Sequence, residues 1–71
     1  MEYSSVSSST IAAVGYDAES ATLAVRFHSG MEYHYFQVPR EVFDGFLAAS
    51  SCGQYLDQHV KKAGYTYARV M

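Results

Sequence analysis

Hydrophobic positions between residues 11 and 38 alternate with polar ones in a pattern typical of β-strands. Three runs rich in β-branched and aromatic residues share this pattern: IAAVGY, ATLAVRFH and MEYHYFQV. Short polar segments with turn composition, DAES and then SG, separate them. The pattern therefore predicts a three-stranded antiparallel meander.

The turn around Gly30 sets the register of the second and third strands. A three-residue loop over residues 28–30, with Gly30 in the left-handed conformation, pairs Arg26 with Glu32 across the strands. A two-residue turn would instead set polar residues beside apolar ones on each face. Because pairing of opposite charges and segregation of apolar residues both stabilise a sheet, we predict the three-residue loop.

In the first hairpin, a four-residue loop over residues 17–20 would place Val14 opposite Leu23. The meander then has one apolar face, which we predict to be the core. It carries Ala12, Val14, Tyr16, Leu23, Val25, Phe27, Met31, Tyr33 and Tyr35. The other face is predicted to be open and flat, and it carries Ile11, Ala13, Gly15, Thr22, Ala24, Arg26, Glu32, His34 and Phe36.

Two amphipathic segments follow Pro39, a residue that suits the first turn of a helix. The first has an apolar stripe with helical spacing, formed by Val42, Phe43, Phe46 and Leu47. The second is predicted to start at Ser51, which stands at capping-box spacing from Gln54, and to end at Gly64. The closing YTYARVM alternates and could add a short strand or strap. The predicted fold class is α+β: a three-stranded antiparallel meander, two helices packed on one face, and a short extended C-terminal tail.

With 71 residues, the chain is long enough for one domain at most. Residues 1–9 are serine-rich and expected to be flexible, and residues 10–71 form the predicted domain. The N-terminus lacks the features of a signal peptide, and no stretch approaches the roughly 18 apolar residues of a membrane span. A single cysteine, Cys52, cannot form an intrachain disulfide. We therefore expect a cytoplasmic protein with no membrane association.

Four segments together resemble the KTSC domain, a family found at the C-terminus of some lysyl-tRNA synthetases and as small stand-alone bacterial proteins. They are SSTIAAVGYD, TLAVRFHSGMEYHYFQVP, ASSCGQYLDQHV and YTYAR. The family's central Y-x-Y motif corresponds to Tyr33 and Tyr35. Asp57 stands where family members often have asparagine. The association with a tRNA-charging enzyme implies RNA binding by analogy.

Tyr33 and Tyr35 allow two interpretations. They could stack on nucleic-acid bases, or they could pack in the core. We predict the core, because their face also carries large apolar residues and two apolar helix stripes need a surface to cover. Cys52 is predicted to be a small buried residue, since no histidine stands at a recognisable dyad spacing from it. The sequence predicts no catalytic residues, no metal site and no cofactor.

Six basic or aromatic residues are candidates for nucleic-acid binding. Arg26, His34 and Phe36 lie on the predicted open face, and Lys61, Lys62 and Arg69 lie near the C-terminus. Basic and aromatic side chains on a small sheet are one way to bind single strands. The formal charge of −2 disfavours long-range attraction to nucleic acid, so such binding would depend on local contacts.

We therefore predict a small non-enzymatic binding domain, with RNA or another single-stranded nucleic acid as its partner. The alternative is a module for protein interaction or self-association, for example a homodimer, that uses the open sheet face.

Overall fold

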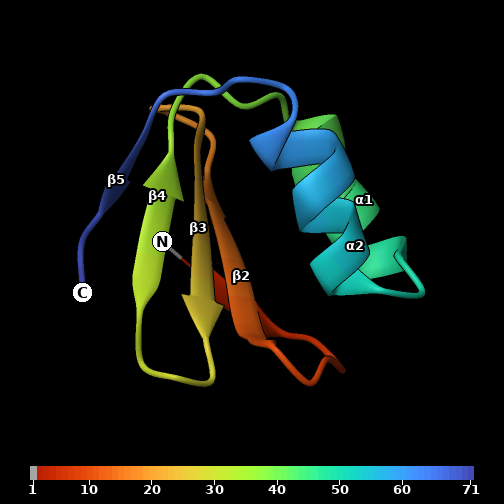
Figure 1. Cartoon of the computed structure of the whole chain (residues 1–71). Helices are drawn as coiled ribbons and strands as arrows, with labels where there is room; N and C mark the ends of the chain where they lie inside the picture. The colour runs from red at the N-terminus through yellow and green to blue at the C-terminus, as the bar shows by residue number, and fades with distance from the viewer. Residues whose placement is uncertain (1) are drawn as a thin grey trace.

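One five-stranded antiparallel sheet and two helical segments make up the structure, a computed structural model that describes residues 2–71 (Figure 1). The strands lie side by side in chain order: β1 (Glu2–Ser5), β2 (Ile11–Asp17), β3 (Thr22–Phe27), β4 (Glu32–Tyr35) and β5 (Tyr67–Arg69). Helix α1 spans Arg40–Ala48, and α2 spans Cys52–Leu56 and continues into a π-helical turn, η1, at Asp57–Lys61. The α+β class is confirmed, but the sheet has five strands and not three.

The two unpredicted strands extend the meander at both edges. β5 comes from the alternating tail that was expected to form a strand or strap, and it pairs with β4. β1 lies within residues 1–9, the segment predicted to be flexible, and pairs with β2. Serine hides the alternation of β1, because it has neither a large apolar side chain nor a strong β preference. Met1 lies outside the described residues.

The turn at Gly30 has the predicted geometry. Arg26 pairs with Glu32, and the amide of Phe27 donates to the carbonyl of Met31 at 2.9 Å. Gly30 has a φ of 96°, a backbone conformation that costs glycine little because it has no Cβ. The register of β3 and β4 is therefore confirmed.

The predicted register of the first hairpin is wrong, because the loop lies one residue later in the chain than expected. Val14 pairs with Val25, and Asp17 is still paired, opposite Thr22, so the loop covers residues 18–21 and not 17–20. Ala21 adopts a left-handed φ of 52°, which turns the chain there, and its carbonyl accepts a hydrogen bond from the amide of Val38 at 2.9 Å. Since the shift moves each strand partner by two residues, the paired side chains from Ala13 onward keep their predicted faces.

Ile11 departs from its predicted face. The register shifts between Ile11 and Ala13, so that one extra residue, Ala12, lies in β2 as a bulge. A bulge reverses the alternation beyond it, and Ile11 is therefore fully buried in the core, although the sequence placed it on the open face.

The core forms where the helices cover the sheet. It includes Tyr35, which is only 4% exposed. The core prediction is thus confirmed for Tyr35, whereas Tyr33 is only partly buried and packs against the core. Cys52 is buried as expected, with its thiol 3.6 Å from the carbonyl of Phe46. Leu47, predicted to lie on the buried stripe of α1, is 50% exposed, so that prediction is wrong. The buried cluster comprises Ile11, Val14, Leu23, Val25, Tyr35, Val38, Phe43, Phe46, Cys52, Leu56 and Val60.

The two helices meet at a glycine. A Cβ atom added to Gly45 would overlap the hydroxyl and ring of Tyr55, whose ring packs 4.7 Å from that of Phe46. Ser51 caps α2 as predicted, because its hydroxyl accepts a hydrogen bond from the amide of Gln54 at 3.4 Å. Within residues 2–71, no helix has the length and apolar character needed to cross a bilayer.

Candidate functional site: an aromatic groove

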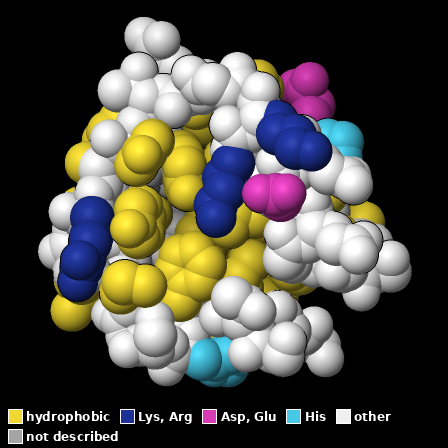
Figure 2. All heavy atoms as spheres, in the orientation of Figure 1, with side chains coloured by type: hydrophobic (Ala, Val, Ile, Leu, Met, Phe, Trp, Pro, Cys, Tyr) yellow, Lys and Arg dark blue, Asp and Glu magenta, His cyan; other side chains and the backbone are white. Residues whose placement is uncertain are grey.

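The helices leave part of the apolar sheet face uncovered. Figure 2 shows hydrophobic side chains at the bottom of a hollow between the sheet and the helices, with Lys or Arg side chains near it. This hollow has a volume of about 880 Å³. We call it the tyrosine groove, and it is lined by Ser9, Thr10, Phe27, His28, Ser29, Met31, Tyr33, Tyr35, Lys61, Gly64, Tyr65 and Tyr67.

Aromatic rings form a continuous wall along the groove. Directly opposite residues in an antiparallel pair point to the same face, so the pairing of Tyr35 with Tyr67 brings the side chains of β4 and β5 together. The ring centroid of Tyr67 lies 6.0 Å from that of Tyr33 and 5.6 Å from that of Tyr35. Phe27 meets Tyr33 edge-on at 6.0 Å. These spacings are those of interacting aromatic pairs.

Exposure differs along this wall. Tyr35 is buried and forms the floor, Tyr33 is half-buried, and Tyr67 is 60% exposed. Burial raises the pKa of Tyr35 above its ordinary value of 10.0, and the neighbouring Tyr33 and Tyr67 raise it further. The phenol of Tyr35 therefore stays neutral at physiological pH, and the rings of Tyr33 and Tyr67 are the ones that a ligand could contact.

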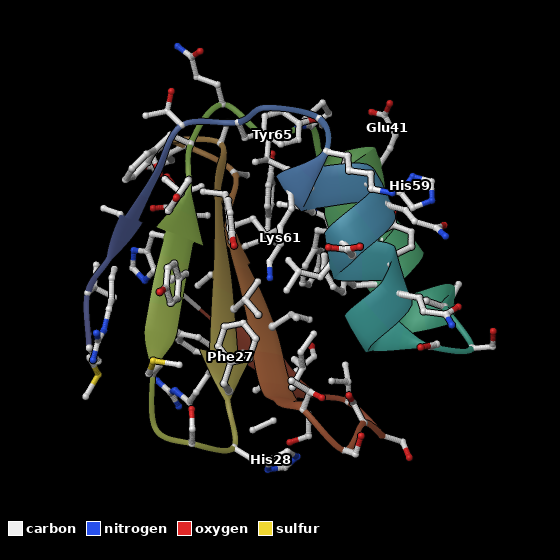
Figure 3. The ribbon with its side chains drawn as sticks, viewed as in Figure 1. Phe27, His28, Glu41, His59, Lys61 and Tyr65 are labelled. Carbon is white, nitrogen blue, oxygen red and sulfur yellow. The ribbon has the colours of Figure 1, made fainter. Side chains whose placement is uncertain are left out.

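Lys61 supplies the positive charge of the groove. Its side chain extends from η1 into the space between helix and sheet, and Tyr65 lies at the same end (Figure 3). The chain turns after η1 at Gly64, whose φ is 83°, and then crosses toward β5. The opposite end of the groove is polar, and there a ring nitrogen of His28 lies 2.9 Å from the carbonyl of Ser8.

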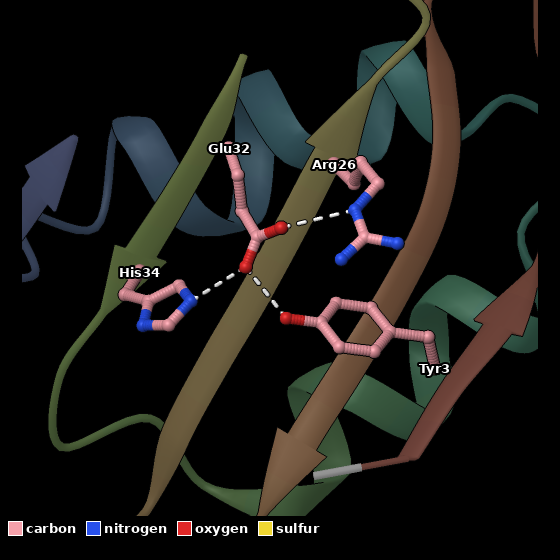
Figure 4. A network of polar contacts seen from close by, with 4 residues as sticks. All are labelled: Tyr3, Arg26, Glu32 and His34. Carbon is pink, nitrogen blue, oxygen red and sulfur yellow. Dashed lines mark hydrogen bonds and ion pairs between the residues drawn. The ribbon is translucent and has the colours of Figure 1, made fainter. Parts of the chain in front are cut away.

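A polar network occupies the sheet face away from the helices (Figure 4). The carboxylate of Glu32, 5% exposed, accepts hydrogen bonds from the Tyr3 hydroxyl at 2.5 Å and from Nε of Arg26 at 3.0 Å. Nε2 of His34 lies 2.8 Å from the same carboxylate. The guanidinium of Arg26 also lies over the Tyr3 ring, 4.3 Å from its centroid. Three strands thus converge on one carboxylate.

The hydrogen bonds to Glu32 lower the pKa of its carboxyl group. The bond from Tyr3 has the largest effect, and together with the contacts from His34 and Arg26 it lowers the pKa from 4.5 to about 2, against the opposing effect of burial. Burial raises the pKa of Tyr3, and the bond to Glu32 adds to this. Glu32 is therefore charged, and Tyr3 neutral, across the physiological range.

A model of the KTSC domain family matches residues 7–69 of the chain. The chain belongs to the KTSC domain family. A KTSC domain protein from Yersinia pestis, solved by crystallography, has the same fold with a TM-score of 0.87 and 30% identity, over 99% of this chain and 97% of that one. A protein from Tsukamurella paurometabola is 50% identical over 79% of this chain and 84% of its own length. An uncharacterised protein from Stutzerimonas stutzeri is 39% identical over 99% of both chains.

In this KTSC domain, the six predicted nucleic-acid-binding residues do not share one surface. Arg26 and His34 lie on the far face of the sheet, where both contact Glu32, and Phe36 follows at the end of β4. That face was expected to be open, but β1 covers part of it. Tyr3 pairs with Gly15, and the Tyr3 ring lies on this face over small side chains.

Of the three C-terminal basic residues, Lys61 and Arg69 lie on the other side. Lys61 lines the groove, whereas Lys62 is exposed beside it. Arg69 pairs with Tyr33, which places it on the groove face of β5, and its Nε donates to the carbonyl of Met71 at 3.1 Å. Of the six predicted residues, Lys61 lines the groove, and Arg69 lies opposite Tyr33 of the aromatic wall.

Sequence reasoning missed that Tyr65 and Tyr67 belong to the site. The signal was present, because the tail repeats the spacing of Tyr33 and Tyr35. It would have been readable if the tail had been assigned to the strand next to β4. Instead, the two helices were expected to cover the whole apolar face, which is broader than two short helices can cover once the sheet has five strands.

Proposed function

We propose that this KTSC domain is a small non-enzymatic module that binds single-stranded nucleic acid, RNA above all, in the tyrosine groove. The observation that carries the proposal is the continuous aromatic wall beside the ammonium group of Lys61. Aromatic rings stack on any base, and a lysine side chain contacts phosphate as a mobile point charge.

The groove suits this role better than the far face of the sheet. There, Nε of Arg26 is committed to Glu32, and the negative carboxylate would repel a phosphate brought close to it. His34 contacts the same carboxylate. Among the described side chains, by contrast, those that line the groove include one lysine and no aspartate or glutamate.

Fluorescence anisotropy with a labelled single-stranded RNA at low salt tests the proposal. Each base–aromatic stack contributes ~1–3 kcal/mol, so Tyr67→Ala should weaken binding by roughly 5- to 150-fold. Because Tyr67 is 60% exposed, the variant should stay folded, which circular dichroism would verify.

Phe36→Ala is the matched control, since Phe36 is an exposed aromatic residue outside the groove. It should bind RNA as the wild type does. A loss in Phe36→Ala with unchanged binding in Tyr67→Ala would move the site to the far face. If the wild type binds no RNA or single-stranded DNA, the proposal is wrong, and a protein partner or a second copy of the chain becomes the better candidate.

A further inference from the structure

One end of the tyrosine groove is crossed by the chain itself. Residues 62–66 run from η1 across the end of the sheet to β5, as the blue connection in Figure 1 shows. Gly64 and Tyr65 of this strap line the groove. The amide of Phe36 donates to the carbonyl of Thr66 at 2.8 Å, which fixes the strap to the end of β4. A polymer that continued through this end would have to displace the strap.

Lys61, the lysine of the groove lining, lies on the strap side. Lys61 is the last residue of η1 and directly precedes the strap, and Figure 3 shows its side chain and Tyr65 between the sheet and the helix. Among the described side chains, those of residues 3–71, Lys61 makes no ion pair; the pairs found there are Arg26–Glu32, His34–Glu32 and Arg40–Asp44.

The size of the groove suits a short ligand. Its volume of about 880 Å³ lies within the range of ~300–1,000 Å³ typical of sites for small molecules. A net charge of −2 also disfavours long polyanions, because each additional phosphate outside the groove meets a negative protein.

We infer that the groove holds the end of a nucleic-acid strand, with a terminal phosphate monoester at Lys61 and the last bases against Tyr33 and Tyr67. This inference rests on the proposed function. An internal phosphodiester carries one negative charge, whereas a phosphate monoester carries about −1.5 to −2 at pH 7 and so attracts a single ammonium group more strongly. The rest of the strand leaves past the polar end of the groove, at Thr10 and His28.

Isothermal titration calorimetry with oligouridylates of equal length tests the inference. The set comprises a linear strand with a 5′-phosphate, one with a 3′-phosphate, one with neither, and a covalently closed circle. One of the phosphorylated strands should bind at least about tenfold more tightly than the unphosphorylated strand and the circle, a difference of ~1.4 kcal/mol. The two phosphorylated strands identify which terminus is held.

Lys61→Met should remove this preference, and Lys62→Met, a neighbouring exposed lysine outside the groove lining, should keep it. A circle that binds as tightly as the phosphorylated strands would overturn end recognition and leave the proposed function intact. Retention of the preference in Lys61→Met would also overturn it. If none of the four oligonucleotides binds, the proposed function itself fails.

Discussion

Glu32 is the residue on which the far face of the sheet depends. Its buried carboxylate accepts hydrogen bonds from Tyr3 in β1 and Arg26 in β3, and it contacts His34 in its own strand. A buried carboxylate without partners would be strongly unfavourable. The network therefore joins the edge strand β1 to the centre of the sheet.

Stability should fall in acid as Glu32 is protonated. The pKa is about 2 in the folded protein and near 4.5 when unfolded, so the folded state favours the charged form. The stabilisation is fully present above pH 4.5 and is lost as the pH falls toward 2. Urea unfolding between pH 2 and 7 should show the free energy of unfolding falling as the pH falls. Glu32→Gln should reduce the slope of this free energy against pH. An unchanged slope in Glu32→Gln would contradict the assignment.

Tyr35 should contribute to stability far more than its neighbours in the groove. Truncation of a large buried aromatic residue costs ~3–5 kcal/mol, and a domain of this size has little more than that in reserve. Thermal denaturation should therefore show Tyr35→Ala to be largely unfolded, with Tyr67→Ala melting near the wild type. A folded Tyr35→Ala variant with a normal melting temperature would refute its place in the core.

The sequence predicts the burial of a single residue when that burial follows from the local pattern. The burial of Cys52 and Tyr35 follows from alternation and helical spacing. The bond from Tyr3 to Glu32 joins residues 29 positions apart, and it exists only because β1 pairs with β2. Nothing in the serine-rich N-terminal segment indicates that strand.

Among the elements, α1 and α2 approach one another closely because Gly45 has no side chain. Helix propensity alone would favour alanine at this position by ~1 kcal/mol. The ring of Tyr55 occupies the space that an alanine Cβ would need. Tertiary packing therefore outweighs local propensity at this site.

Gly45→Ala should destabilise the domain even though alanine is the better helix former. The methyl group would push Tyr55 and α2 away from Phe46, and such overpacking costs ~1–3 kcal/mol. Chemical denaturation of Gly45→Ala, Tyr55→Ala and the double variant measures the effect. In the Tyr55→Ala background, Gly45→Ala should be neutral or stabilising. Additive losses would show that the two residues do not compete for space.

The central elements were predictable, and the edges were not. The alternation and turn chemistry of residues 22–35 determine a single register for β3 and β4. The β2 bulge and the displaced first loop depend on tertiary contacts, such as the hydrogen bond from Val38 to Ala21, that no local pattern reveals. The same holds for the groove, which exists because β5 widens the apolar face.

The affinity of the domain for RNA should depend only weakly on salt. The sequence suggests three phosphate contacts, from Lys61, Lys62 and Arg69. With three contacts, log affinity would fall with log salt with a slope of magnitude about 2. Of these three residues, Lys61 alone lines the groove, so we expect a slope of magnitude ~0.7, the value for one contact with a single strand. RNA titrations between about 50 and 200 mM salt would measure this slope. A slope of 2 or more would indicate a wider basic surface.

We propose the tyrosine groove as the binding surface of this KTSC domain. Amide chemical shifts recorded with and without a short single-stranded RNA test it most directly, because they report binding and location together. We expect the largest shifts at four residues of the groove lining, Tyr33, Lys61, Tyr65 and Tyr67. Shifts confined to Arg26 and the far face, or no shifts at any RNA concentration used, would contradict it.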